Sequence, residues 1–458
     1  MNPFQDNNIE DRILRVFCDV KPLKNSLASL CDHSGWRIYS LCSLPMFTMT
    51  DSNFDPVPLT VLEQESSKDH CFYRFQIRSD LFWNDGSQIT GFDYKRGIEH
   101  LCSDPSHRFR SIFLDVDGYK ELSSGSEKSL RGLKAGKDWV SFQLRNANIL
   151  FPMLLTFPGA SPRHAKHPEL MPGAYTVTEV SHQSLKLRLQ EPFFGHTKQA
   201  NIIEFDFSLP QSDPYGLERW RAGKVHETWD CYFPYEKTAD FESLPEFNQS
   251  NPGIYVTLKP QLCGQKISAG IIKKLNMILD RDAICHHLCS DVRSFYGFSS
   301  DKKYTLNDLE TTRETLIIAW EDFIPNKDLV KCIQKQAKKS GIDVELRKVN
   351  YGEHCKDAHL KLTLIHQSFP DPLLFYRGEL TDPSFCDRSS SIWLNYAKIF
   401  TQYQRSGREI RKDQGRVMDI ILQEQGRFIP IVSLPGYLLR SQLIEKNEYS
   451  PGKPWRWA

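Results

Sequence analysis

The sequence predicts a mixed α/β protein in which a strand-rich first half is followed by a half that alternates strands and helices. The 458 residues suggest two or three domains, since a domain holds roughly 150 residues. Within residues 1–210, short segments alternate apolar and polar side chains, which is typical of strands with one buried face. Later, a continuous apolar run at 316–320 and an amphipathic segment at 329–339 indicate buried parallel strands joined by crossover helices.

The strands of the first half are separated by clear turn signals. Phe, Tyr and Ile alternate with polar residues over 71–78, and Asn84-Asp85-Gly86 predicts the turn that follows. Thr90 and Asp93 have the spacing of an N-cap and its acidic partner, so a helix is expected after Thr90. A short polar segment after residue 180 predicts a hairpin. The strands predicted in this half cover residues 13–18, 71–78, 139–144, 174–180, 184–189 and 202–207.

The second half contains two kinds of periodicity. Apolar residues recur at helical spacing from Ile267 to Leu279, which predicts a helix over 267–289. The amphipathic helix at 329–339 is closed by Ser340-Gly341 and followed by a strand. The other elements predicted here are strands at 316–320, 342–349, 360–365 and 428–434 and a helix at 413–425.

Charge and hydropathy exclude two classes of protein. Lys and Arg total 58 and Asp and Glu total 57, so the net charge of +1 gives no electrostatic basis for binding nucleic acid. The longest apolar stretch, Ile149–Phe157, is interrupted by Pro152 and is far shorter than the roughly 20 residues that a membrane helix needs. We therefore expect no nucleic-acid partner and no membrane span.

The N-terminus and the cysteines bear on location. Residues 1–11 are polar and acidic and lack the basic and apolar regions of a signal peptide. The twelve cysteines are scattered and form no Cys-x-x-Cys pair, which favours reduced, buried thiols. Both features predict a cytoplasmic location, or else a chain that has been processed, trimmed or assigned the wrong start.

One short segment has the residue types of a metal site. Cys285-His286-His287-Leu288-Cys289 places two cysteines at i and i+4 with two histidines between them. These side chains could be soft metal ligands, or a helix could bury both cysteines and expose the histidines, which is the interpretation we favour. The sequence has no nucleophile elbow, zinc-protease, phosphate-loop or dinucleotide-binding motif. We predict no enzyme, and with it no catalytic residue, no metal and no cofactor.

One longer stretch resembles the signature of a known family. Residues 73–93, YRFQIRSDLFWNDGSQITGFD, are similar to the block Y-x-F-x-L-R-x-G-x-x-W-x-D-G-x-P-[IV]-T-A-x-D of the oligopeptide, dipeptide and nickel solute-binding proteins of ABC transporters, known as family 5. Further blocks resemble that family in the same order along the chain. They are residues 172–175, 221–225, 275–281, 334–346 and 369–375.

The resemblance implies a fold and a division into domains. The fold would be a two-lobed clamp of the type II periplasmic-binding-protein class, with an extra strand-rich subdomain in the N-terminal lobe. Such a clamp closes because its ligand contacts both lobes. Lobe I would comprise residues 1–25, 171–255 and 435–458, the inserted subdomain residues 26–170, and lobe II residues 256–434.

The resemblance also implies a function. The protein would be the monomeric solute-binding component of an ABC importer, which captures oligopeptides or a related small solute and delivers them to the membrane subunits of a permease. Its location would then be periplasmic or membrane-associated. The alternative is a cytosolic ligand-sensing or scaffold protein of the same fold with no role in transport.

The binding segment departs from the family at one position. In the family, an aspartate three residues before the Asp-Pro aspartate holds the α-amino group of the ligand, and this chain has Ser368 there. A serine cannot neutralise an ammonium group, and a buried unpaired charge costs several kcal/mol. For Asp371 and Trp393, turn capping and core packing are equally open interpretations. The ligand contacts that the resemblance implies are His366, Gln367, Ser368, Phe369, Asp371, Trp393, Asp19 and Lys21.

Overall fold

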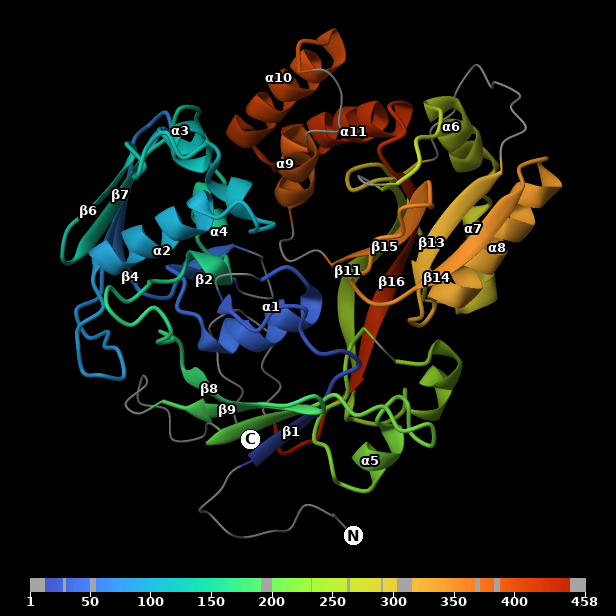
Figure 1. The fold of residues 1–458 in the computed structure, drawn as a ribbon, viewed down its shortest axis with the longest axis horizontal. Coiled ribbons are helices and arrows are strands. Elements are labelled where there is room, and N and C mark those ends of the chain that lie inside the picture. The colour runs from blue at the N-terminus through green and yellow to red at the C-terminus, as the bar shows by residue number, and fades with distance from the viewer. Residues whose placement is uncertain are drawn as a thin grey trace. The chain divides into compact units, whose positions relative to one another are not determined.

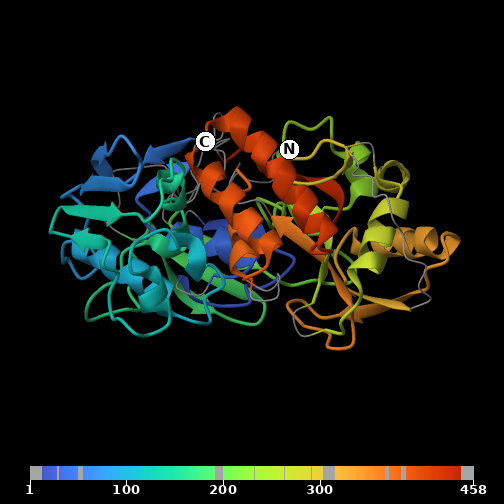
Figure 2. The same ribbon diagram turned by 90° about the horizontal axis from the view of Figure 1, so that it is seen from above.

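Figure 1 and Figure 2 show the fold in a computed structural model of the chain. The structure describes residues 13–27, 30–49, 55–190, 200–231, 233–261, 264–289, 291–302, 315–366, 371–382 and 388–444. The chain forms two compact units. Residues 1–228 and 440–458 make unit 1, and residues 229–439 make unit 2. The chain therefore passes between the units twice.

The first sheet of unit 1 has four strands. Its order is β1 (Ile13–Phe17), β10 (Ile202–Asp206), β9 (Ser184–Leu189) and β8 (Tyr175–Val180). β1 is parallel to β10, whereas β8 and β9 form the predicted antiparallel hairpin. Leu185, Leu187, Ile203 and Phe205 are all buried, as the alternation of apolar residues in these strands predicts.

The second four-stranded sheet of unit 1 is antiparallel. Its order is β4 (Val61–Ser66), β5 (Phe72–Ile77), β7 (Trp139–Gln143) and β6 (Leu133–Ala135). Helix α2 (Gly91–Ser103) packs against β6 and β7. Its predicted capping box is confirmed, because the Thr90 N–H donates to the Asp93 carboxylate at 2.8 Å. The other elements of unit 1 are α1 (His33–Tyr39), η2 (Ser40–Cys42), β2 (Phe47–Met49), β3 (Pro56–Pro58), η3 (Arg110–Phe113), α3 (Tyr119–Ser123), α4 (Phe151–Leu154), η4 (Pro158–Ala160) and α5 (Leu217–Arg221).

Unit 2 is built on one six-stranded sheet. Its order is β12 (Arg293–Ser294), β16 (Ile429–Leu439), β11 (Phe247–Pro260), β15 (Leu360–His366), β13 (Leu316–Glu321) and β14 (Val344–Val349). β13 is parallel to both β14 and β15, and β11 is antiparallel to both β15 and β16. The core includes Val256, Ile318, Leu360 and Ile431. The continuous apolar run of β13 is thus explained by its place in the interior of a partly parallel sheet.

Helices cover this sheet and extend beyond it. Helix α8 (Asn326–Lys339) connects β13 to β14 and lies against both strands (Figure 1). It buries Leu329, Val330, Ile333 and Ala337, which share one helical face. The other helices of unit 2 are η5 (Tyr235–Asp240), α6 (Ala269–Ile278), α7 (Arg281–Leu288), α9 (Leu373–Thr381), α10 (Ser391–Arg405) and α11 (Arg408–Glu424). α10 and α11 lie side by side (Figure 2).

Several boundaries differ from the prediction. The helix predicted over 267–289 is two helices, because the Asp280 carboxylate accepts from the Ala283 N–H at 3.0 Å and starts α7 as an N-cap. The predicted helix 413–425 begins earlier, at Arg408, and the strand predicted at 428–434 continues to Leu439.

The predicted lobe boundaries differ from the boundaries between the two compact units. The boundary between residues 255 and 256 falls inside β11, and that between 434 and 435 falls inside β16. The two compact units instead divide at 228/229 and 439/440. How the predicted lobes and the inserted subdomain map onto these units stays a prediction.

Two further features concern the helices and the cysteines. None of the helices in the described residues combines the length and hydropathy that a membrane span requires. The ten cysteines that the structure describes form no disulfide with one another. Burial raises the pKa of the Cys42 and Cys102 thiols, so both are kept protonated and unreactive.

Candidate functional site

In unit 1, the candidate site begins where β1 ends. The Phe17 N–H donates to the carbonyl of Glu227 at 2.9 Å, and the Cys18 N–H donates to the carbonyl of Asp206 at 2.8 Å. Directly after β1, Asp19 is buried, with 5% of its surface exposed. Lys21 reaches the β8–β9 hairpin and donates to the carbonyl of Ser181 at 3.0 Å. The contact of Asp19 and Lys21 with a ligand stays a prediction.

The two segments that connect the units run beside each other. In unit 1, the Ser441 N–H donates to the carbonyl of His226 at 2.8 Å. In unit 2, the Tyr437 N–H donates to the carbonyl of Asp230 at 3.0 Å. The outgoing and returning chains are therefore hydrogen-bonded to each other on both sides of the division.

A buried ionic cluster fixes this connection in unit 1. Glu227 has no exposed surface, and its two carboxylate oxygens accept from Arg37 in α1 and, at 2.6 Å, from Arg440 on the returning chain. One carboxylate thus joins both connecting segments to α1. The cluster was not predicted from the sequence, because Arg37 and Arg440 lie 190 and 213 residues from Glu227.

His226 lies beside this cluster and is itself buried. Its Nδ1 accepts from the Arg15 N–H at 3.0 Å. Burial, and secondly the positive charge of Arg15, lower its pKa from 6.5 to about 4. At this residue the unfolded chain therefore binds more protons than the folded one between these values, so the contribution of His226 to stability is lost as the pH is lowered through this window.

We expect His226→Asn to remove this acid sensitivity. Between pH 7 and pH 4.5 the wild-type protein should lose about 2 kcal/mol more of its free energy of unfolding than the variant does. Urea unfolding at both pH values measures the difference. His182→Asn, at an exposed histidine, is the control and should behave as wild type. Equal losses in wild type and His226→Asn would contradict a neutral, buried His226.

In unit 2, the segment predicted to contact ligand follows β15. His366 is the last residue of β15 and pairs with Ile254 of β11. Gln367, Ser368 and Phe369 lie outside the residues that the structure describes. Their contact with a ligand, and that of His366, stays a prediction.

Asp371 organises the helices that follow this segment. Its Oδ1 accepts from the Tyr403 hydroxyl of α10 at 2.6 Å and from the Leu373 N–H of α9 at 3.0 Å. Its Oδ2 accepts from Arg411 Nε of α11 at 3.0 Å. Capping of α9 and packing between α10 and α11 therefore account for this carboxylate. A ligand contact by Asp371 stays a prediction.

Trp393 lies in the first turn of α10. Its side chain is half-buried. Its backbone N–H donates at 3.2 Å to the hydroxyl of Ser390, which is the N-cap of that helix. Its neighbours Ile392 and Leu394 are 39% and 54% exposed, so this helix end presents apolar surface. Whether Trp393 walls a ligand pocket stays a prediction.

Helix α11 also carries a buried carboxyl group, that of Asp419. Its Oδ2 accepts from the Ser299 N–H at 2.7 Å and from the Ser300 hydroxyl at 3.2 Å, and its Oδ1 accepts from the Tyr376 hydroxyl at 3.1 Å. Burial raises its pKa from 3.8 to about 7, although the hydrogen bonds act in the opposite direction. Gly297 is required here, because a Cβ at this position would lie 2.5 Å from Oδ2.

The possible metal ligands match the favoured interpretation of the sequence only in part, because Cys289 is half-buried and lies just after α7 as its C-cap. Cys285 is buried, with its sulfur 3.6 Å from the Ser294 hydroxyl, whereas His286 and His287 are exposed.

A second pair of neighbouring histidines, His164 and His167, lies in unit 1. The Nδ1 of His164 accepts from the backbone N–H of His167 at 2.8 Å. The proton of a neutral His164 is therefore on Nε2, which leaves no free lone pair on that ring for a metal.

Comparison with known proteins identifies the fold. No protein-family model matches the sequence, and no curated protein does. Among solved structures, Haemophilus influenzae OppA in complex with the peptide RPPGFSPFR is similar at TM-score 0.81 and 16% identity, over 97% of both chains. The substrate-binding domain of the Bacillus anthracis oligopeptide ABC transporter is similar at TM-score 0.81 and 13% identity, over 98% of this chain and 99% of that one.

A third similar structure holds a different ligand. Campylobacter jejuni NikZ in complex with Ni(L-His) is similar at TM-score 0.75 and 14% identity, over 95% of both chains. The names of these three structures describe a complex with a peptide, a substrate-binding domain and a complex with Ni(L-His). The predicted fold class, a mixed α/β two-lobed solute-binding fold with several sheets, is confirmed.

Proposed function

From the fold of the oligopeptide and nickel solute-binding proteins, which this chain has over nearly its full length, we propose that it is the solute-binding component of an ABC importer. Its ligand would be an oligopeptide or a related small solute, which it would deliver to a membrane permease. The observation that carries this proposal is the full-length similarity to a peptide-bound structure. The order of family blocks between residues 70 and 375 supports it independently.

The way the ligand is held should differ from the usual one. Ser368 stands where the family has the aspartate that pairs with an α-amino group. The next carboxylate along the chain, Asp371, already lies 3.0 Å from Arg411, so its charge is neutralised within the protein. A ligand without a free amino group avoids the cost of a buried, unpaired ammonium. This favours blocked or uncharged ends over free peptide N-termini.

We expect N-acetylated peptides to stabilise the protein more than the same peptides with free N-termini. The measurement is thermal unfolding with pools of di- to pentapeptides in both forms. A ligand at one hundred times its dissociation constant adds about 2.7 kcal/mol, which for a chain of this size shifts the melting temperature by roughly 3 °C. No shift with either pool would contradict peptide capture, and nickel with histidine is then the next ligand to try.

A matched pair of variants tests the role of position 368. Ser368→Asp restores the carboxylate of the family and should shift the preference toward free N-termini. Ser368→Asn has a similar volume without the charge and should keep the preference of the wild-type protein. An unchanged preference in Ser368→Asp would show that another group recognises the end of the ligand.

A cytosolic ligand-sensing or scaffold role is the second candidate. The observation that favours it is the absence of any disulfide among the ten described cysteines, three of which, Cys18, Cys42 and Cys102, are completely buried. Alkylation of thiols in intact cells, together with fractionation, separates the two functions. Recovery of the protein outside the cytoplasm would exclude the sensing role.

A further inference from the structure

One edge of the unit 2 sheet has no strand beside it among the described residues. That edge is β14, which pairs only with β13. The Leu316 N–H donates to the carbonyl of Asp343 at 2.8 Å, so the odd-numbered residues of this strand direct their backbone groups toward β13. In a strand, the N–H and C=O of one residue point to the same side, and those of the next residue point to the opposite side. The backbone groups of Val344, Leu346 and Lys348 therefore face outward.

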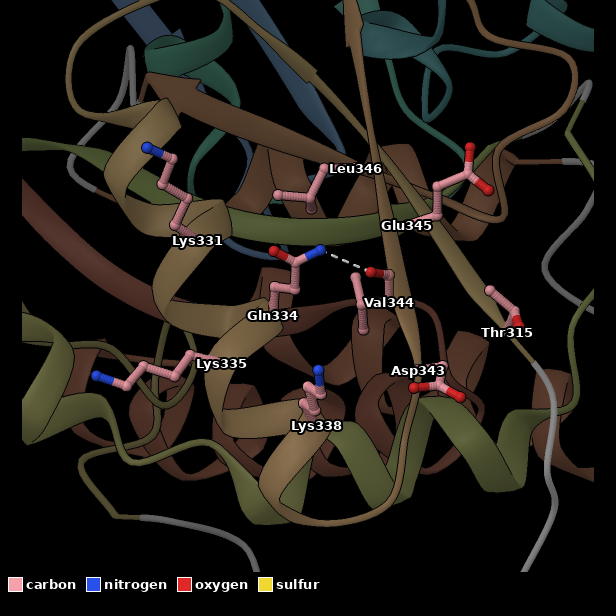
Figure 3. Close-up of a pocket in the computed structure, with 9 residues that line it drawn as sticks. All are labelled: Thr315, Lys331, Gln334, Lys335, Lys338, Asp343, Val344, Glu345 and Leu346. Atoms are coloured by element: carbon pink, nitrogen blue, oxygen red, sulfur yellow. Dashed lines mark hydrogen bonds between the residues drawn. The ribbon is translucent and has the colours of Figure 1, made fainter.

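The protein itself occupies one of these outward positions. Gln334 of α8 donates its side-chain amide to the carbonyl of Val344 at 2.7 Å (Figure 3). This amide stands where the N–H of an added strand would lie. The outward N–H and C=O of Leu346, by contrast, make no hydrogen bond with any residue that the structure describes. An extended segment could pair with this residue without displacing any element of the sheet.

A groove of about 780 Å³ follows this edge. Figure 3 shows Lys331, Lys335 and Lys338 along α8 on one side of it and β14 on the other. Val344 and Leu346 are half-buried and give the groove its apolar lining. The groove thus offers backbone pairing, apolar contact and a row of cationic side chains in one place.

The charge of the groove is positive. Lys331, Lys335 and Lys338 are exposed and form no ion pair with any residue that the structure describes. The acidic Glu345 is paired with Arg347 at 2.9 Å, and Arg347 also lies 3.3 Å from Asp357. Among the described residues that line the groove, Asp343 is then the one carboxylate without an ion pair to oppose the three lysines. Charged side chains of one sign beside an exposed edge discourage pairing with a strand of the same charge and favour one of opposite charge.

We propose that β14 and the adjacent face of α8 bind an extended, acidic segment of a partner protein, which adds to the sheet as a further strand. Its main chain pairs with Leu346, and its carboxylates face Lys331, Lys335 and Lys338. A second copy of this chain is a poorer occupant. Two β14 strands paired about a twofold axis would place both α8 helices, with their lysines, on the same face of the joined sheet.

The test uses a fluorescent peptide that is acetylated and amidated at its ends and alternates valine with glutamate over ten residues. Fluorescence anisotropy with the full-length protein should show binding that weakens as salt is added, because screening reduces the attraction between exposed charges. A peptide that alternates valine with lysine should not bind. Equal binding of the two peptides, or no binding of the acidic one, would overturn the proposal.

Two sets of variants assign the binding to β14. Leu346→Pro removes the outward N–H from an edge strand, where proline is tolerated, and should weaken binding at least tenfold. Leu346→Ala keeps that N–H and should bind within about threefold of the wild-type protein, since only side-chain contact is lost. Replacing Lys331, Lys335 and Lys338 by glutamate should abolish binding, and it tests the site independently if Leu346→Pro does not fold. Wild-type affinity in the triple variant would overturn the proposal.

The result is separable from that of the proposed function. The variants in β14 and α8 should leave the thermal shift with small peptides unchanged, and Ser368→Asp should leave binding of the acidic ten-residue peptide unchanged. Sedimentation of the chain alone completes the test. A dimer that Leu346→Pro dissociates would assign the edge to a second copy and contradict an acidic partner.

Discussion

Replacing Glu227 by alanine is expected to lower the free energy of unfolding by about 3 to 5 kcal/mol, because two buried guanidinium groups lose the carboxylate that neutralises them. Glu227 is fully buried, and the side chains of Arg37 and Arg440 are 3% and 10% exposed. Little solvent is available to compensate for the lost charge. Urea unfolding followed by circular dichroism measures the change.

Two controls show whether the cost comes from the buried charge. Glu121→Ala breaks an exposed ion pair with Arg131 and should change stability by less than about 1 kcal/mol. The triple variant Arg37→Met, Glu227→Leu, Arg440→Met removes all three charges and keeps the volume apolar. It should be more stable than Glu227→Ala, since a buried ion pair can often be replaced by packed apolar groups at little cost. The opposite order would mean that the hydrogen bonds, rather than charge balance, hold the connecting segments.

The strands and helices that could be predicted are those in which the spacing of apolar residues matches the side chains that the element buries. In β5, Tyr73, Phe75 and Ile77 are buried, as the alternation predicts. Strand β11 was not predicted. It begins within a polar stretch, and its pairing with β16 is interrupted by a register shift between Ser250 and Ile254. Its position depends on neighbours from distant parts of the chain, which no local pattern encodes.

The candidate site was less predictable than the fold for the same reason. The blocks of the resemblance directed attention to the segment before Asp371, which follows the strand that the apolar pattern predicted at 360–365. They did not predict that the Asp371 carboxylate is shared by Tyr403 and Arg411. Nor did any local signal indicate that Glu227 joins Arg37 to Arg440. Side chains with ordinary sequence neighbours acquire these roles only when the units are folded.

The contribution of the buried Asp419 carboxyl to stability should fall as the pH rises from about 4 to about 7, opposite in sign to the contribution of His226. The pKa of Asp419 is about 7 in the folded protein and near 3.8 in the unfolded chain. Between these values the folded state binds more protons than the unfolded state does, so raising the pH favours unfolding. The full effect is on the order of 4 kcal/mol, since each pKa unit corresponds to about 1.4 kcal/mol. Above pH 7 the contribution is constant.

Asp419→Asn isolates this contribution. The amide oxygen can still accept from the Ser299 N–H, and the amide group carries no charge at any pH. Relative to the wild-type protein, the variant should therefore gain stability steadily from pH 4 to pH 7, as measured by urea unfolding at intervals of one pH unit. Asp413→Asn, on the exposed side of the same helix, should run parallel to the wild-type protein throughout. A difference between Asp419→Asn and wild type that does not change with pH would mean that the carboxyl is already ionised in the folded state, and that its hydrogen bonds to Ser299, Ser300 and Tyr376 outweigh the cost of burial.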